Sequence, residues 1–197
     1  MPIKNTAETY GTIAKTLHWV SAGLFLISYC SIYYREWLAE TDLENWAAIQ
    51  LHFSVGFTVL VVTLLRIIWR LLNRQPELEF TFSFQRFAIR IGHYLLYVIL
   101  IIMPISGYLS IADYLASGRG SVSYFLMFEM TSLKDIQLFE SIGLTLKQLE
   151  DPADSVHSFL GSWIVWLLVV GHISAALYHH FISEDRTLSK MTFHRTD

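Results

Sequence analysis

Residues 155–183 read SVHSFLGSWIVWLLVVGHISAALYHHFIS and contain no Asp, Glu, Lys or Arg. About 20 apolar residues of helix cross the hydrocarbon core of a bilayer, so this stretch predicts a transmembrane helix. It carries His157 and His172 at positions 15 residues apart, which on a helix is about 22 Å along the axis and about 60° around it. A histidine ring in hydrocarbon is costly without a partner. The stretch therefore predicts a membrane helix that uses histidines at two depths.

Three further stretches without formal charge, 16–34, 45–65 and 91–112, are also long enough to cross a membrane. The whole chain of 197 residues is 53% hydrophobic and only 16% charged, which excludes an ordinary soluble domain. These features predict an all-α fold, a transmembrane four-helix bundle forming a single domain over residues 1–197. The single cysteine, Cys30, excludes a disulfide framework, a thiolate-held iron–sulfur cluster and covalently attached haem.

The distribution of basic residues predicts the orientation in the membrane. With four spans, the N-terminus, the 66–90 connection and the C-terminal tail share one side, and this side carries 10 of the 14 Lys and Arg residues. Positive residues mark the cytoplasmic side, so we expect both termini in the cytoplasm. The opposite side has a formal charge of −7, which favours a cationic periplasmic redox partner or a neutral quinol there. No basic surface supports nucleic-acid binding.

The connection 113–154 is long and contains two apolar clusters, 124–130 and 136–146. Loops of this length without structure are uncommon. We expect a structured outer loop, with one or two short helices lying over the outer end of the bundle. They serve either as a lid or as a surface for a partner, and no feature of the sequence chooses between these roles.

The histidines carry the chemistry, and they lie in two layers. His52 and His157 are at the outer ends of their helices, and each is followed four residues later by a glycine, Gly56 and Gly161. A glycine one turn from a ligand leaves room for a porphyrin to lie against the helix, although small residues also serve helix packing. Facing imidazoles at two depths of a four-helix bundle are what two b-type haems need. His52 and His157 are the expected ligands of an outer haem.

The inner layer allows two pairings. His172 lies among small residues, and His18 in the first helix is its natural partner, while His93 in the third competes for that position. Arg66 and Arg70 are one helical turn apart at the same level, so they are either anchors in the headgroup region, cations for the propionates of an inner haem, or both. Histidines that only make contacts between helices, or that carry a metal ion, are the alternatives. A metal path normally includes carboxylates, which the four stretches lack.

Several motifs resemble the bacterial cytochrome b561 family over residues 10–191. They are Lys15-Thr-Leu-His18-Trp19, His52, Arg66-Ile-Ile-Trp-Arg70, Gly92-His93, Met103-Pro104-Ile105-Ser106-Gly107-Tyr108 and His172-Ile-Ser-Ala-Ala-Leu-Tyr-His179-His180-Phe181. The resemblance implies a four-helix protein of the bacterial inner membrane with two haem b groups that exchanges electrons with the quinone pool. It implies haem ligation by His52 with His157 and by His18 with His172, in agreement with the argument from depth.

The resemblance also implies that His179 and His180 lie where quinone, expected to be ubiquinone, binds and is protonated. One family member is a superoxide oxidase, which makes a superoxide:ubiquinone oxidoreductase the alternative function. Two departures matter. The spacing from His157 to His172 is one residue longer than is typical of the family, which predicts either a local bulge in the fourth helix or a slightly different position of the outer ligand. The acidic outer side has the wrong sign to attract superoxide.

The sequence therefore predicts a membrane cytochrome that passes electrons between a periplasmic donor and the quinone pool. Superoxide oxidation ranks second, and a membrane anchor or metal carrier without haem ranks third.

Overall fold

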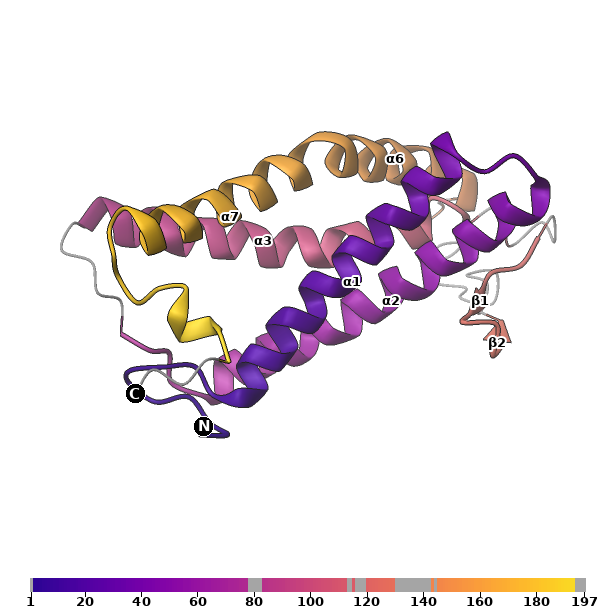
Figure 1. The fold of residues 1–197 in the computed structure, drawn as a ribbon. Helices are drawn as coiled ribbons and strands as arrows, with labels where there is room; N and C mark the ends of the chain where they lie inside the picture. Colours follow the sequence, from indigo (N-terminus) through magenta and orange to yellow (C-terminus); the bar gives the residue numbers. More distant parts are fainter. Residues whose placement is uncertain are drawn as a thin grey trace. The chain divides into compact units, whose positions relative to one another are not determined.

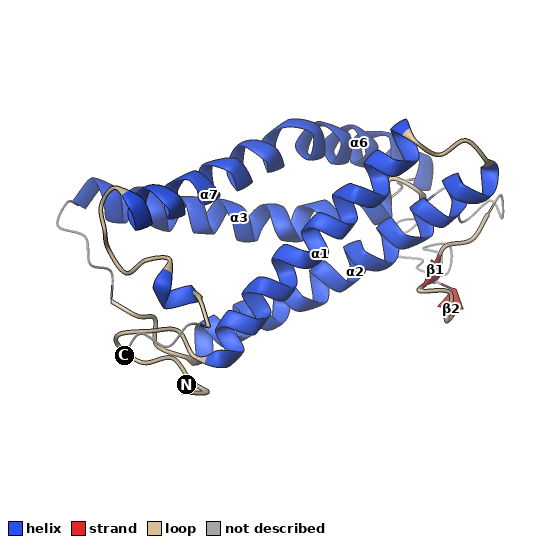
Figure 2. Ribbon diagram, in the orientation of Figure 1, coloured by secondary structure: helices blue, strands red, loops and turns tan. Residues whose placement is uncertain are grey.

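Helices make up most of the protein in the computed structural model, which describes residues 2–77, 83–112, 115, 120–129, 143 and 145–193 (Figures 1 and 2). The first three are α1 (Thr12–Trp37), α2 (Asp42–Leu72) and α3 (Ser83–Leu109). The fourth helical stretch consists of α6 (Leu146–Phe159), a π-helix η2 (Leu160–Ile164) and α7 (Val165–Phe181). Two short strands, β1 (Ser123–Tyr124) and β2 (Phe128–Glu129), and a 3-10 turn η3 (Ser189–Met191) complete the described elements.

Three of the helical stretches are long and apolar enough to cross a membrane. They are Asp42–Leu72, Phe84–Leu109 and Leu146–Phe181. Only 28%, 6% and 6% of their most apolar windows are buried within the protein, so most of these apolar side chains need lipid around them. Among the described helices, α1 does not reach the same hydropathy, because polar residues such as His18, Ser21 and Ser28 lie within its charge-free stretch. The fourth span predicted at 16–34 stays a prediction.

The helices do not end where the charge-free stretches end. α2 continues through Arg66 and Arg70 to Leu72, and α3 starts before Arg86 and ends at Leu109 rather than at residue 112. The fourth helical stretch starts at α6, where Thr145 and Gln148 form a capping box, and ends at Phe181 rather than at residue 183. The charge-free stretches show which residues can lie in hydrocarbon. They do not give the helix ends, because a helix can continue beyond the hydrocarbon into polar surroundings.

The connection 113–154 was expected to contain one or two short helices, and the cluster at 124–130 does not form one in the residues that the structure describes. Residues 123–129 form an antiparallel hairpin in which Ser123 pairs with Glu129 and Tyr124 with Phe128. Phe125 and Leu126 adopt positive φ angles of 45° and 61°, which makes a tight turn and prevents a helix there. Of the second cluster, 136–146, most residues lie outside the described part of the chain.

The chain divides into two compact units. Unit 1 contains Met1–Ala22, Val61–Ile99 and Trp163–Asp197, and unit 2 contains Gly23–Leu60 and Leu100–Ser162. Each long helical stretch contributes a segment to both units, because every boundary falls within a helix. The prediction of a single domain over residues 1–197 stays a prediction.

Unit 1 brings three separate parts of the chain together at the start of α1. The Lys15 ammonium donates to the carbonyl of Thr192 (2.8 Å), and the Trp19 indole donates to that of Met191 (2.9 Å). The Lys190 ammonium donates to the carbonyl of Glu77 (2.8 Å). Figure 1 shows the yellow C-terminal segment returning to the indigo start of the chain. The N-terminal segment, the connection after α2 and the C-terminal tail therefore meet.

Candidate functional site

His52 of α2 and His157 of α6 face each other in unit 2. Their ring centroids are 6.1 Å apart and the ring planes are nearly perpendicular, at 88°. The Nδ1 of His52 lies 3.0 Å from the carbonyl oxygen of Ser28 and 3.2 Å from the Ser28 hydroxyl. Because a carbonyl can only accept, the Nδ1 of His52 is the protonated nitrogen, and the lone pair is on Nε2. This is the hydrogen bond that orients metal-ligating histidines.

His157 is held in the same way by α3. Its Nδ1 lies 2.9 Å from the carbonyl oxygen of Met103 and 3.2 Å from the hydroxyl of Ser106. The imidazole lies directly against Gly107, where a Cβ atom would come within 2.8 Å of the His157 Cε1 atom. The glycine in α3 therefore makes the space that the ring of His157 occupies.

The glycines that follow the two histidines differ in their surroundings. A Cβ atom at Gly56 would meet nothing within 4 Å, so the space beside α2 is open one helical turn after His52. At Gly161 it would lie 3.2 Å from the Met103 methyl group, the end of a flexible side chain. The space at Gly56 fits a planar macrocycle lying against the helix, whereas the space at Gly161 is narrower.

The bulge expected between His157 and His172 is confirmed. Residues Leu160–Ile164 form a π-helix between α6 and α7, and a π-helical turn takes up one more residue than an α-helical turn. The carbonyl of Gly161 within this turn accepts a hydrogen bond of 2.7 Å from the Tyr29 hydroxyl of α1. The tyrosine thus satisfies a backbone group of the irregular turn, as hydrocarbon surroundings require.

Three imidazoles meet in unit 1. The ring centroid of His172 lies 6.2 Å from that of His18 and 5.6 Å from that of His93. The Nδ1 of His93 donates to the carbonyl of Ile89 (2.8 Å), which leaves the lone pair on Nε2. The structure brings together His172 and both of its candidate partners and does not choose between them.

His18 differs from the other histidines in its Nδ1 partner. The guanidinium Nη2 of Arg66 lies 3.2 Å from the Nδ1 of His18. A guanidinium can only donate, so the Nδ1 of His18 accepts in this arrangement. Binding a metal through Nε2 with Nδ1 protonated requires the Arg66 side chain to turn away from the imidazole.

Arg66 and Arg70 form a cationic group beside Tyr97 of α3. Their guanidinium carbons lie 5.3 and 5.9 Å from the centroid of the Tyr97 ring. No carboxylate of the described residues lies within 4 Å of either guanidinium. Burial raises the pKa of the Tyr10 hydroxyl, against the opposing effect of Arg70, so Tyr10 stays neutral and supplies no negative charge. Trp69, on the same face, has a buried indole N–H without a partner among the described residues.

The structure separates His179 from His180. His179 is buried at the end of α7, and its Nδ1 lies 2.6 Å from a carboxylate oxygen of Asp185, whereas His180 is exposed. Burial raises the pKa of Asp185, but hydrogen bonds from Thr187 and His179 outweigh it and hold that pKa below its ordinary value. Asp185 is therefore a carboxylate at neutral pH, and the Nδ1 of His179 donates to it.

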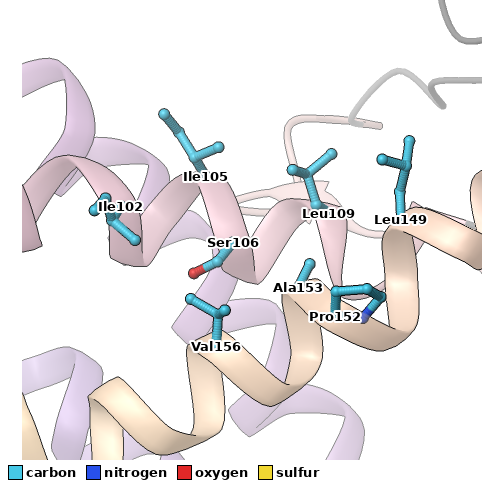
Figure 3. A pocket seen from close by; sticks show the side chains of 8 residues that line it. All are labelled: Ile102, Ile105, Ser106, Leu109, Leu149, Pro152, Ala153 and Val156. Carbon is cyan, nitrogen blue, oxygen red and sulfur yellow. The ribbon is translucent and has the colours of Figure 1, made fainter. Parts of the chain in front are cut away.

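An open apolar groove lies between α3 and α6 on unit 2, lined by Ile102, Ile105, Ser106, Leu109, Leu149, Pro152, Ala153 and Val156 (Figure 3). Ser106 is its one hydroxyl-bearing residue, and the same hydroxyl contacts the imidazole of His157. The groove therefore borders His157 of the His52–His157 pair. Its lining is almost entirely apolar, so it suits an apolar occupant.

The spacing of the imidazoles fits haem iron. Bonds from a metal to an imidazole nitrogen are about 2.0–2.1 Å long, and the ring centroid lies about 1.1 Å behind that nitrogen, so two imidazoles on opposite sides of one metal have centroids about 6.2 Å apart. The His52–His157 and His18–His172 distances are 6.1 and 6.2 Å. Free Nε2 lone pairs on His52 and His157, together with the open space at Gly56, complete the fit.

Sequence reasoning missed several residues of these sites. Ser28 and Asp185 hold His52 and His179, and nothing in their local sequence marks them. Met103, Ser106 and Gly107 stand in a motif that the sequence analysis noted, but only the fold shows that all three contact His157.

Comparison with known proteins identifies the family of this chain. Residues 9–194 match the family model of prokaryotic cytochrome b561. Cytochrome b561 homolog 2 of Escherichia coli K12 is 33% identical, over 97% of this chain and 95% of the relative. A probable superoxide oxidase CybB of Yersinia pestis is 26% identical, over 93% of this chain and 96% of the relative. Cytochrome b561 homolog 1 of E. coli K12 is also 26% identical, over 89% of this chain and 92% of the relative. The chain therefore belongs to the prokaryotic cytochrome b561 family, and it is a multi-pass membrane protein that binds haem b and takes part in electron transfer.

Proposed function

We propose that the protein is a di-haem b cytochrome that passes electrons between a periplasmic donor and the quinone pool. The observation that carries the proposal is the presence of two imidazole pairs, His52 with His157 and His18 with His172, at 6.1 and 6.2 Å. Haem would supply an iron that changes oxidation state by one electron, and the two histidines of each pair would hold it and leave it closed to other ligands. The histidines then hold electron carriers rather than a site that activates oxygen.

His93 stands beside the inner pair without being one of its ligands in this proposal. Its ring lies closer to His172 than two ligands of one iron do, at 5.6 Å between centroids. The sequence order of the family motifs also favours His18. An inner haem that survives in His93→Ala and is lost in His18→Ala supports this assignment, and the reverse result contradicts it.

Arg66, Arg70 and Trp69 supply donors for the propionates of the inner haem. Arg66 is partly buried, and neither guanidinium has a carboxylate partner among the described residues, so a dianionic group would supply the missing counter-charge. The unpartnered indole N–H of Trp69 adds a third donor on the same face of α2. If Arg66 turns to a propionate, it also leaves the Nδ1 of His18 free to carry a proton.

The test is the reduced-minus-oxidised absorption spectrum of the purified protein, combined with a pyridine haemochrome assay of haem per chain. We expect two haem b groups per chain, and the loss of one in His52→Ala and of a spectrally different one in His172→Ala. One haem per chain in the parent protein, or loss of the same haem in both variants, would contradict the two-site arrangement.

We further propose that His179 passes protons to quinone at the cytoplasmic side. It is buried, and its hydrogen bond to the carboxylate of Asp185 keeps the imidazole in one orientation. Asp185 is then a positioning residue, and His180, which is exposed, has no such support. Of the two histidines named by the sequence, the geometry favours His179.

Stopped-flow oxidation of the reduced protein by a short-chain ubiquinone tests this role. His179→Gln should slow the reaction about tenfold or more, because a general acid typically contributes at least that much. Asp185→Asn should slow it less and change its pH dependence, while the haem spectrum stays as in the parent. His180→Gln is the matched control, and an equal effect there would contradict the assignment.

Oxidation of superoxide is the second candidate, because a relative from Yersinia pestis bears the name probable superoxide oxidase. Against it stands the formal charge of −7 on the proposed periplasmic side. Rapid haem reduction by enzymatically generated superoxide, slowing as salt is added, would reverse this ranking, because that behaviour requires a local basic surface.

A further inference from the structure

The β1–β2 hairpin presents four consecutive apolar side chains to the outside of the protein. Phe125, Leu126, Met127 and Phe128 are 42%, 66%, 70% and 58% exposed. A continuous run of this kind is unusual on a surface that faces water, and it marks a contact with another apolar phase or molecule. The position of the hairpin along α2 shows which phase that is.

A polar face of α2 holds the backbone of the hairpin. The Gln50 side chain donates to the carbonyl of Ser121 (3.0 Å) and accepts the N–H of Ser123 (2.7 Å). The fully buried Ser54 hydroxyl accepts the N–H of Phe125 (2.8 Å). The same hydroxyl lies 2.7 Å from the carbonyl oxygen of Gln50 in its own helix and 3.1 Å from that of Ser123, and its single proton is available to either. These side chains take the place of water as partners of the backbone groups.

The contact continues one turn further along α2. The hydroxyl of Thr58 lies 3.1 Å from the phenol oxygen of Tyr124, and the ring of Phe57 packs against the Tyr124 ring at 5.5 Å between centroids. Gln50, Ser54 and Thr58 are each one helical turn apart, so the hairpin follows α2 over about 12 Å rather than extending beyond its end. Figure 1 shows β1 and β2 beside the N-terminal part of α2.

The register on α2 gives the depth of the hairpin. Glu44 is the last charged residue before the charge-free stretch of this candidate span, and Ser54 follows it by about 15 Å along the helix. The hydrocarbon core is about 30 Å thick, so the level of Ser54 lies inside it. Leu51 and Phe57, at the same levels of α2, are themselves 40% exposed apolar side chains.

We propose that residues 121–129 form a re-entrant hairpin whose tip, residues 125–128, inserts into the hydrocarbon of the leaflet on the side where α2 begins. Irregular backbone is tolerated at that depth only when its polar groups have protein partners, and Gln50 and Ser54 provide them. Glu129 is opposite Ser123, at the end of the hairpin away from the tip.

Cysteine labelling in nanodiscs tests the proposal, with Cys30→Ser as the background. Leu126→Cys and Met127→Cys should react with a charged maleimide at least tenfold more slowly than Glu40→Cys in the exposed connector between α1 and α2. Their rates should match that of Leu64→Cys, which is exposed on α2 within the span. Retention of the parent absorption spectrum shows that each variant is folded. Reaction of the two tip cysteines at the rate of Glu40→Cys would overturn the proposal, because the tip would then lie in water, where only a partner protein could cover it.

Two further measurements do not depend on substitutions in the tip being tolerated. In the unmodified protein, a phosphatidylcholine with a diazirine on its acyl chain should label the peptide that contains residues 125–128; labelling of the α2 peptide alone would overturn the proposal. In the Leu126→Cys protein, Ser54→Ala should raise the rate of maleimide labelling severalfold. The matched control is Ser21→Ala, which removes a buried serine whose hydroxyl, among the described residues, donates within α1 to the carbonyl of Leu17. An equal change in both would contradict an anchoring role for Ser54.

Discussion

Gly107 shows how one missing side chain shapes a ligand site. The ring of His157 occupies the position next to the Gly107 backbone, and a Cβ atom there would lie 2.8 Å from the Cε1 atom of the ring. Such a contact is too short, so the imidazole would have to shift from its hydrogen bond with Met103. The ring that would ligate the outer haem is therefore placed by α3, although it belongs to the helical stretch that starts with α6.

Gly107→Ala should therefore weaken binding of the haem held by His52 and His157. We expect the content of that haem in the purified protein to fall by roughly half or more, while the inner haem stays, as measured by redox-difference spectra. Gly92→Ala is the control on the same helix, because a Cβ atom at that position meets nothing within 4 Å. A full complement of both haems in Gly107→Ala would show that the imidazole tolerates the displacement.

The sequence predicts ligand types better than it predicts their supports. Histidines stand out in apolar stretches because a polar ring in hydrocarbon is costly unless it has a partner or a ligand, and the rise of the helix per residue gives their depth. Ser28 and Met103 hold their imidazoles through backbone carbonyls, which every residue has. Such partners depend on how helices pack and leave no mark in composition. For the same reason, the sequence does not show which of His179 and His180 has a carboxylate partner. The structure shows it, because the turn after α7 places Asp185 against His179.

At the scale of the elements, the π-helix η2 explains how this chain carries one additional residue between His157 and His172. An insertion into a regular helix would rotate everything that follows by about 100°. The π-turn at Leu160–Ile164 takes up that residue locally. The spacing was enough to predict a bulge, but its place became visible only in the structure, where Tyr29 bonds to the carbonyl of Gly161.

Deletion of Ser162 should be tolerated, since the remaining residues can form a regular α-helix there. We expect both haems to be retained with a modest loss of thermal stability. Deletion of Val169, in the regular helix α7, should remove the haem bound by His172, because it rotates the residues after it. Haem content per chain and the melting temperature should be measured for each of the two deletion variants. Equal loss of haem in the two variants would mean that η2 does not take up the additional residue.

Charge patterns located the helices but not their ends or the loop structure. Thr145 and Gln148 begin α6 well before the charge-free stretch, because a helix needs caps and hydrogen bonds rather than absence of charge. The apolar residues at 124–130 indicated structure in the connection, but apolar runs of this length fit a strand as well as a helix, and here they form a hairpin. Its strand pairing depends on Gln50 and Ser54, which are distant in the sequence.

For the whole molecule, the contacts of unit 1 bear on whether α1 crosses the membrane. The start of α1 meets the connection after α2 and the C-terminal tail, through hydrogen bonds such as Asn5 to the Arg74 carbonyl and Lys15 to the Thr192 carbonyl. Its end leads through residues 38–41 to the start of α2. If α2 spans the membrane, α1 must run from one side to the other, whatever its hydropathy.

Four spans and the excess of Lys and Arg on one side together place both termini in the cytoplasm. Alkaline phosphatase, which is active only in the periplasm, should be active when fused after Thr41 and inactive when fused after Glu77 or at the C-terminus. Green fluorescent protein should fluoresce at either terminus. With only three spans, the N-terminus and Thr41 would lie on the same side of the membrane, opposite the C-terminus. An N-terminal fluorescent fusion that is bright while the Thr41 fusion is inactive, or dark while that fusion is active, would be the contradicting result. That result would also contradict the His18–His172 site, because α1 would then no longer lie alongside α7 within the bilayer.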